Sequence, residues 1–282
     1  MKKLLMTAGA LVVCLASFAQ ADSTQSKKDT TIVREESDTI RIGGTIIIKK
    51  RSTTEKKEVH VMTHKKKRSG GPSTSWLAVD LGFANFRERS NYAAAAAQGM
   101  VQPGLTKDNL DLRTGKSVNV NVWLFFQRLP LVKKVVNLKY GLGVELNNYR
   151  FDNETVAFRK NPTFIALDNS YQDVRKNKLA ADYVTVPMML NFNLTPRMKY
   201  GFGFSGGLSA GYLYSSRQKI KNNDGGKFKV RDDFDLRRWK LAYVGELNLG
   251  PARLYGSYAL KNMWEKGLDQ RPYTVGIRLS HF

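Results

Sequence analysis

A ten-residue stretch before the middle of the chain, Ser117 to Phe126, alternates between apolar and polar side chains. Val118, Val120 and Val122 take every second position, and the residues between them are Asn. Because successive side chains of a β-strand point to opposite faces, such a segment has one apolar face and one polar face. The pattern predicts a strand between an apolar environment and a polar one.

Similar alternation recurs from residue 76 to the C-terminus. The predicted strands are 76–86, 117–126, 138–147, 181–194, 200–212, 238–249, 253–260 and 273–280. Their connections are alternately long and short, which is typical of outer-membrane barrels with long external loops and short periplasmic turns. We therefore predict an all-β fold, an eight-stranded antiparallel up-and-down transmembrane β-barrel over residues 76–282. This barrel would lie in the outer membrane of a Gram-negative bacterium with both termini periplasmic.

The second face of these strands is polar and carries both signs of charge. A soluble barrel would instead turn its apolar face inward. An eight-stranded barrel is only wide enough to be filled by its own side chains, so we expect internal ion pairs that close the lumen. A proton or ion path is the alternative. The candidates are Lys139, Glu145, Lys240, Glu246, Arg253 and Arg278.

Residues 1–21 have the features of a secretion signal. A basic start precedes an apolar stretch from Leu4 to Phe18, and a small-residue site predicts cleavage between Ala21 and Asp22. Cleavage two residues earlier is the alternative, and lipidation at Cys14 is a second one. Cys14 is the chain's single cysteine, so the mature chain would have no disulfide, thiolate nucleophile or cysteine metal site.

Residues 22–75 are predicted to be a basic, polar and disordered periplasmic linker. The segment 22–71 has 13 Lys and Arg against 7 Asp and Glu, hence +6, and no aromatic residue. It cannot bury enough apolar surface to fold alone. Within it, Gly43-Gly44 between β-branched runs predicts a hairpin over 39–48. This hairpin is either transient or a strand that pairs with a partner, so an envelope or secretion protein is a possible partner of residues 22–71.

The net charge of +22 indicates an anionic partner. For a secreted chain, we expect outer-membrane lipid headgroups or a phosphorylated glycolipid and no nucleic acid. The predicted loop 215–235 and its flank to residue 238 hold eight Lys and Arg against four Asp, hence +4. The candidates for glycolipid contact are Arg217, Lys219, Lys221, Lys227 and Lys229.

The sequence predicts no catalytic, metal or cofactor site. His60 and His64 have a spacing that a helix could use for a metal, but β-branched neighbours and a Lys/Arg run oppose it. Only His281 lies in the barrel region, without the partners of an acyl-transfer site. Residues 223–226, Asn-Asp-Gly-Gly, predict a turn and not a calcium site, because the lysines around them would repel a cation.

The segment Tyr183-Val184-Thr185-Val186-Pro187-Met188-Met189-Leu190 resembles the Tyr-x-x-x-Pro-x-x-Leu strand of PorT-like outer-membrane β-barrel proteins of Bacteroidota-type bacteria. The glycine-rich strand 201–211 and the ending at 276–279 are also similar. This resemblance covers about residues 76–282, and it implies an accessory role in protein secretion. The chain departs from the usual pattern of such barrels at Phe282, because this terminal aromatic residue is out of phase with the outward residues of the last predicted strand.

Three functional hypotheses follow from these features. The first is a non-enzymatic integral outer-membrane protein with a structural, anchoring or interaction role. The alternative is an accessory component of an outer-membrane secretion apparatus, as the resemblance implies. The third is a narrow pore, which the predicted number of strands disfavours.

Overall fold

The computed structural model describes residues 38–42, 45–49, 60–63, 71–132, 135–160, 162–171, 174–195, 201–250 and 252–279. The chain divides into two compact units, Met1–Arg68 and Ser69–Phe282. The expected signal peptide, its cleavage site at Ala21 and Asp22, and Phe282 lie outside the described residues. None of the helices in the described ranges combines the length and the hydropathy of a membrane-spanning helix.

The first unit contains a three-stranded antiparallel sheet. Strand β1 (Asp38–Ile42) pairs with β2 (Thr45–Lys49), and β2 pairs with β3 (His60–Thr63). The hairpin predicted over 39–48 is confirmed in its position. The third strand, β3, was not predicted, and β-branched residues supply strand propensity for this local pairing.

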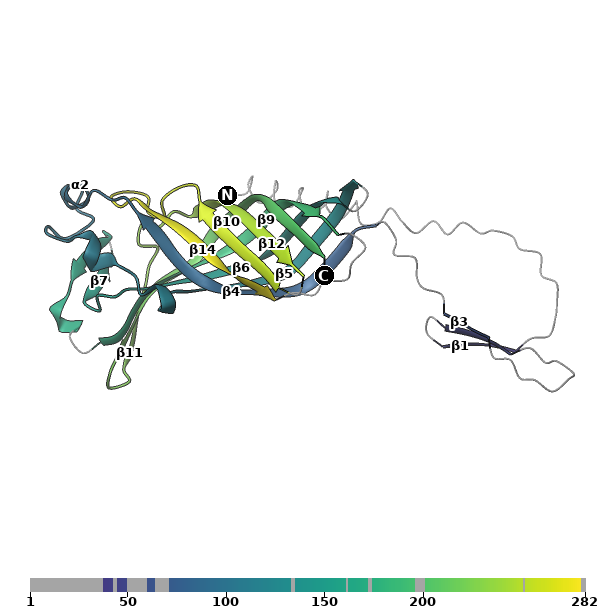
Figure 1. The fold of residues 1–282 in the computed structure, drawn as a ribbon. Helices are drawn as coiled ribbons and strands as arrows, with labels where there is room; N and C mark the ends of the chain where they lie inside the picture. Colours follow the sequence, from purple (N-terminus) through teal and green to yellow (C-terminus); the bar gives the residue numbers. More distant parts are fainter. Residues whose placement is uncertain are drawn as a thin grey trace, which may run out of the picture. The chain divides into compact units, whose positions relative to one another are not determined.

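The second unit is a ring of eight antiparallel strands (Figure 1). The strands are β4 (Ser73–Glu88), β5 (Val118–Val132), β6 (Val136–Arg150), β9 (Val174–Asn193), β10 (Phe202–Asn222), β12 (Trp239–Leu249), β13 (Ala252–Ala259) and β14 (Gln270–Leu279). Each pairs with the next in this order, and β14 pairs with β4 to complete the ring. The predicted number, order and antiparallel pairing of the strands are confirmed.

The ring is not paired to the same extent all round. Strands β9 and β10 pair from Gly203 to Asn222, whereas β13 and β14 pair only from Leu254 to Tyr258. Pro187 lies within β9 and has no backbone N–H to donate to a ladder bond. The β6–β9 pairing skips Val186 and Pro187 without changing register, so the ladder is interrupted and no bulge forms.

Alternate residues of each strand face opposite environments, as the sequence predicts. In β6, every second residue is buried along the whole strand. The outward residues form an apolar band, which is exposed in the isolated chain. It includes Leu81, Phe83, Val118, Val184, Val186, Met188, Leu190, Phe204, Leu208, Leu241, Leu247, Leu254, Val275, Ile277 and Leu279. Such a surface suits lipid.

Two segments that we expected to be polar loops carry buried structure. Residues 87–114 contain α2 (Tyr92–Ala97) and a 3-10 turn at Lys107–Leu110. Residues 150–178 contain the hairpin of β7 (Val156–Arg159) and β8 (Phe164–Leu167). Together with residues 232–238 and 260–269, they pack into what we call the cap, at the end of the ring where α2 and β7 lie (Figure 1).

The predicted loop 215–235 is also corrected. Strand β10 continues to Asn222 and pairs with β11 (Lys227–Arg231), so most of this segment is a projecting hairpin. Its connection is the predicted turn, where the Asn222 amide donates to the carbonyl of Gly226 at 3.0 Å. Gly225 has φ of +87°, a conformation that suits glycine.

Candidate functional site

The interior of the ring holds two ion pairs between β6 and β12. The Lys139 Nζ lies 2.6 Å from Oε2 of Glu246, and the Lys240 Nζ lies 2.8 Å from Oε2 of Glu145. On both strands a Lys precedes a Glu by six positions, and the two strands run in opposite directions. Each Lys therefore meets the Glu of the other strand. The two pairs tie β6 to β12, which are not neighbours in the ring.

A third cation, Arg278 of β14, joins this group through β4. Its Nε and Nη2 donate to the two carboxylate oxygens of Asp80 at 2.6 and 2.7 Å. Its Nη1 contacts Glu246. Arg suits this place because its planar fork engages a carboxylate with two parallel hydrogen bonds. Arg278 thus links the first and last strands of the ring to β12.

These six charged side chains, which we call the luminal network, are almost wholly buried. Asp80 is 0% exposed, Lys139 2% and Glu246 5%. Three carboxylates meet three cations, so the network has no net charge. Polar neighbours add hydrogen bonds to oxygens that are already ion-paired: Trp123 Nε1 donates to Oδ2 of Asp80 at 2.7 Å, and the Thr185 hydroxyl donates to Oε2 of Glu145 at 2.8 Å. Buried charges need such pairing and hydrogen bonding to offset their desolvation.

Aromatic rings and glycines fill the space beside the luminal network. The Lys139 ammonium lies 4.5 Å and the Arg278 guanidinium 4.6 Å from the ring centre of Phe126. Gly82 and Gly276 face each other across β4 and β14, and the ring of Tyr255 covers them. A Cβ at either glycine would overlap backbone oxygens of the neighbouring strand. The lumen at this level is therefore filled by protein.

Five of the six predicted luminal residues therefore meet in the luminal network, and Arg253 is the exception. Arg253 on β13 is half-buried and is not a member of the six-residue network, so its pairing in the lumen stays a prediction. Asp80 joins the network although it was not among the predicted luminal candidates. Its sequence signal is a single carboxylate at an inward position of the strand 76–86, where the neighbouring inward residues are Ala and Gly. Other predicted strands carry Arg and Lys at inward positions.

The cap closes the loop end with its own aromatic core. Phe158 stacks on Trp264 with ring centres 6.0 Å apart, and it also contacts Phe151 and Phe234. Gln218 of β10 holds β7 in place, because its Oε1 accepts from the Phe158 amide at 3.0 Å and its Nε2 donates to the Val156 carbonyl at 2.8 Å. The cap is therefore fixed to the strands below it.

A second polar chain joins the cap to the end of β4. Trp264 Nε1 donates to Gln270, whose Nε2 donates to Glu88 at 2.6 Å. Tyr92 of α2 also donates to Glu88, at 3.1 Å. Burial and the neighbouring Glu88 carboxylate raise the pKa of the Tyr92 phenol above its ordinary value, so this donor stays protonated.

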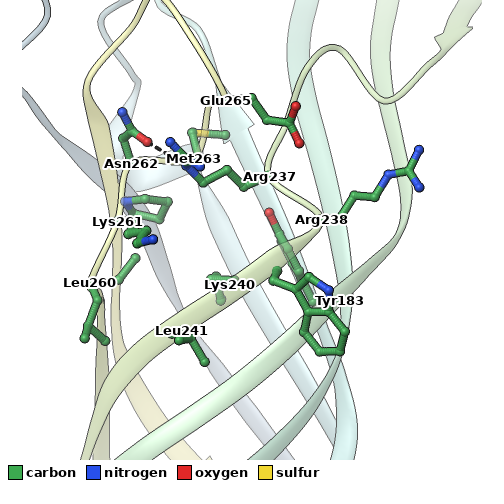
Figure 2. Close-up of a pocket in the computed structure, with 13 residues that line it drawn as sticks. Tyr183, Arg237, Arg238, Lys240, Leu241, Leu260, Lys261, Asn262, Met263 and Glu265 are labelled. Atoms are coloured by element: carbon green, nitrogen blue, oxygen red, sulfur yellow. Dashed lines mark hydrogen bonds between the residues drawn. The ribbon is translucent and has the colours of Figure 1, made fainter. Parts of the chain in front are cut away.

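A cavity of about 410 Å³ lies where β12 meets the cap (Figure 2). Trp239, Leu241 and Leu260 give it apolar walls, and Tyr183 and Lys240 of the ion-paired interior also line it. Arg237 at its edge donates to Asn262 at 2.9 Å. Its lining has no His, Ser or Cys, so it lacks the members of a Ser-His or Cys-His pair.

The glycolipid-contact candidates lie on the projecting hairpin. Arg217, Lys219 and Lys221 are partly exposed on β10, and Lys227 and Lys229 are exposed on β11. Within the described ranges, no three His, Cys, Asp or Glu side chains are grouped to hold a metal. His60 lies on strand β3, which removes the helical spacing that a pair with His64 would need; His64 and His281 lie outside the described residues.

A ring of eight antiparallel strands with an apolar outer band and an ion-paired interior defines an integral β-barrel membrane protein. The chain belongs to the outer membrane protein beta-barrel domain family, whose sequence model matches residues 83–264. The match includes four members of the luminal network and leaves Asp80 and Arg278 outside it. No curated protein sequence matches the chain. The family places the protein in the outer membrane.

Proposed function

We propose that this protein is a non-enzymatic, non-conducting barrel with a structural, anchoring or interaction role. The luminal network is the observation that supports it. Six buried, mutually neutralising side chains cross the interior, and the cap packs over one end. An ion passing through would have to break buried pairs, each of which is costly to separate. The functional surfaces are then the exterior, the cap and the N-terminal segment.

Conductance measurements in planar bilayers test this proposal. The purified full-length protein should give no regular conductance steps at moderate voltage. A variant with Lys139→Ala, Glu246→Ala and Arg278→Ala removes three long side chains from one level of the lumen, and it should give small steps if it still folds. Regular conductance from the native protein would refute a closed barrel.

A secretion-accessory role, as in PorT-like proteins, is the second candidate. The strands β1 to β3 favour it, because they form a sheet in a unit separate from the barrel, as a docking module on the periplasmic side would. This role assumes that both termini are periplasmic. In mild detergent, the full-length protein should then retain envelope or secretion proteins that a variant lacking residues 22–71 loses. Equal recovery from both would refute it.

A further inference from the structure

Four cations from four consecutive strands stand side by side on the second unit. Strand registers place Arg150 of β6 opposite Lys178 of β9, Lys178 opposite Lys219 of β10, and Lys219 opposite Lys229 of β11. Residues directly opposite each other in antiparallel strands lie about 5 Å apart and share a face. Neighbouring strands are about 4.8 Å apart, so this row is about 14 Å wide.

The rows on either side repeat the pattern. Lys176, Lys221 and Lys227 lie opposite one another on β9, β10 and β11, and Arg217 lies opposite Arg231. We call these nine residues the basic ladder. Its members are Arg150, Lys176, Lys178, Arg217, Lys219, Lys221, Lys227, Lys229 and Arg231.

The protein itself supplies little negative charge to the basic ladder. Asp182 pairs with Arg217, and it is the one carboxylate that the ion pairs of the described residues bring to these nine cations. Arg150 donates to the carbonyl of Arg175 at 2.8 Å, and Lys178 donates to Asn148. Those acceptors are neutral. Like charges directly opposite one another destabilise a sheet, so the arrangement disfavours the unliganded state.

The crowding is visible in the acid–base behaviour of Lys178, which lies beyond the apolar band. Desolvation of its ammonium group by burial, together with the neighbouring charges of Lys176 and Lys219, lowers its pKa to about 8. An anion placed between these cations would favour the protonated form of Lys178 and relieve the repulsion.

The basic ladder faces outward, directly beyond the apolar band. A register shift between Leu213 and Ser215 changes the phase of β10. After it, Gln218 and Ile220 are buried toward the cap, and the alternating cations Arg217, Lys219 and Lys221 take the other face. Before it, Tyr212 is exposed and contacts Trp239 with ring centres 5.1 Å apart. Aromatic residues of this kind mark the boundary between lipid tails and headgroups, so the ladder begins at headgroup level.

We propose that the basic ladder binds the phosphate groups of an anionic glycolipid, with its acyl chains against the apolar band. This inference rests on the proposed role as an integral outer-membrane barrel with the cap outside. Phosphate is the favoured group because it accepts several charge-assisted hydrogen bonds at once. Apolar contact below and cations above fit an amphiphile better than a free ion. A glycolipid would thus hold together the projecting ends of β6, β9, β10 and β11.

Glycolipid retention by the full-length protein tests this proposal. The ladder variant combines Lys178→Gln, Lys219→Gln and Lys229→Gln. The control variant removes the same charge from exposed positions in the cap and just after its first segment, with Lys107→Gln, Lys116→Gln and Lys160→Gln. Each is purified in mild detergent, and bound glycolipid is measured by mass spectrometry. The ladder variant should retain about tenfold less glycolipid than wild type, since three charge-assisted contacts are lost. The control should match wild type.

Two added arms identify the ligand chemistry. Binding of the purified glycolipid should weaken strongly after its phosphates are removed enzymatically, and millimolar inorganic phosphate should compete poorly. Equal retention by the ladder variant and wild type, or undiminished binding of dephosphorylated glycolipid, would overturn the proposal. Strong competition by inorganic phosphate would identify a free-phosphate site and overturn the glycolipid assignment.

Membrane fractionation separates this inference from the proposed function. Folded barrel in the outer-membrane fraction with no bound glycolipid would refute the basic ladder alone. Absence of wild type from that fraction would refute the proposed role itself. The ladder variant should also fold, as judged by faster gel mobility before heating than after it. Replacing the same three lysines by Arg should preserve glycolipid retention, because charge and donors remain.

Discussion

The ammonium of Lys139 lies 2.6 Å from a carboxylate oxygen of Glu246, although 107 positions separate the two residues in the chain. The contact crosses the interior between β6 and β12. In the second pair the roles of the strands are exchanged, since β12 supplies Lys240 and β6 supplies Glu145. A barrel of this width thus uses paired charges where a soluble protein would use apolar packing.

Breaking one partner of this pair should be costly. Lys139→Met leaves Glu246 with Arg278 alone, and we expect a loss of about 3–5 kcal/mol of unfolding free energy, as for other buried pairs. Urea unfolding in lipid vesicles, followed by tryptophan fluorescence, measures it. The double variant Lys139→Met with Glu246→Leu should recover part of the loss, and the double-mutant cycle gives the coupling.

The partly exposed pair between Lys266 and Asp235, 3.2 Å apart, is the control for this experiment. Asp235→Asn should cost less than about 1 kcal/mol, because solvent screens the pair. A cost for Lys139→Met as small as that for Asp235→Asn would contradict a buried structural role for the network.

Arg278→Lys tests the fork geometry. Lys keeps the charge but cannot donate two parallel hydrogen bonds to Asp80 while contacting Glu246. We expect a loss of about 1–3 kcal/mol, measured by the same unfolding assay, as for removal of a hydrogen bond to a charged group. Unchanged stability would mean that the charge of Arg278 suffices.

Two glycines of one barrel give a matched comparison. Gly276→Ala places a Cβ against the Leu81 carbonyl and the ring of Tyr255, so overpacking should destabilise the barrel by about 1–3 kcal/mol. Gly206→Ala on the outward face of β10 meets nothing within 4 Å and should change stability by less than about 0.5 kcal/mol. Equal effects would show that packing inside the barrel is looser than these contacts imply.

The cap should open without unfolding the barrel. Trp264→Ala removes a fully buried ring that stacks on Phe158, a change that typically costs about 3–5 kcal/mol. Limited proteolysis should then cut within 87–117 or 151–173, while the strands keep their circular dichroism signal. Exposed Leu241→Ala serves as the control. Protease resistance equal to wild type would show that the cap does not depend on this stack.

Alternation predicted the strands well because each face of a strand meets one kind of environment along the apolar band. Alternation did not predict the ends of β9 and β10 beyond the apolar band, because the outward residues there are cations. Leu179 and Ile220 still point toward buried neighbours there, but the outer surface is no longer apolar. The contrast between the two faces therefore disappears, and the segment is typical of a loop.

The cap was missed for a different reason. Its core depends on Phe158 meeting Trp264 from a segment more than a hundred positions away, and neither segment has regular periodicity of its own. The luminal partners were predicted as a set because inward charges are rare. Their pairing required the registers of β6 and β12, which a sequence pattern does not give.

The position of Arg278 on the last strand has a consequence for how the barrel assembles. Within the luminal network, the strands from β4 to β12 supply three carboxylates and two ammonium groups, an excess of one negative charge, until Arg278 arrives with β14. If the ring closed early, between two other strands, this unpaired negative charge would stay buried where it is poorly solvated. Closure through the last strand brings Arg278 to Asp80 and Glu246 and leaves the luminal network neutral, so the cation at position 278 distinguishes the completed barrel from its unfinished forms.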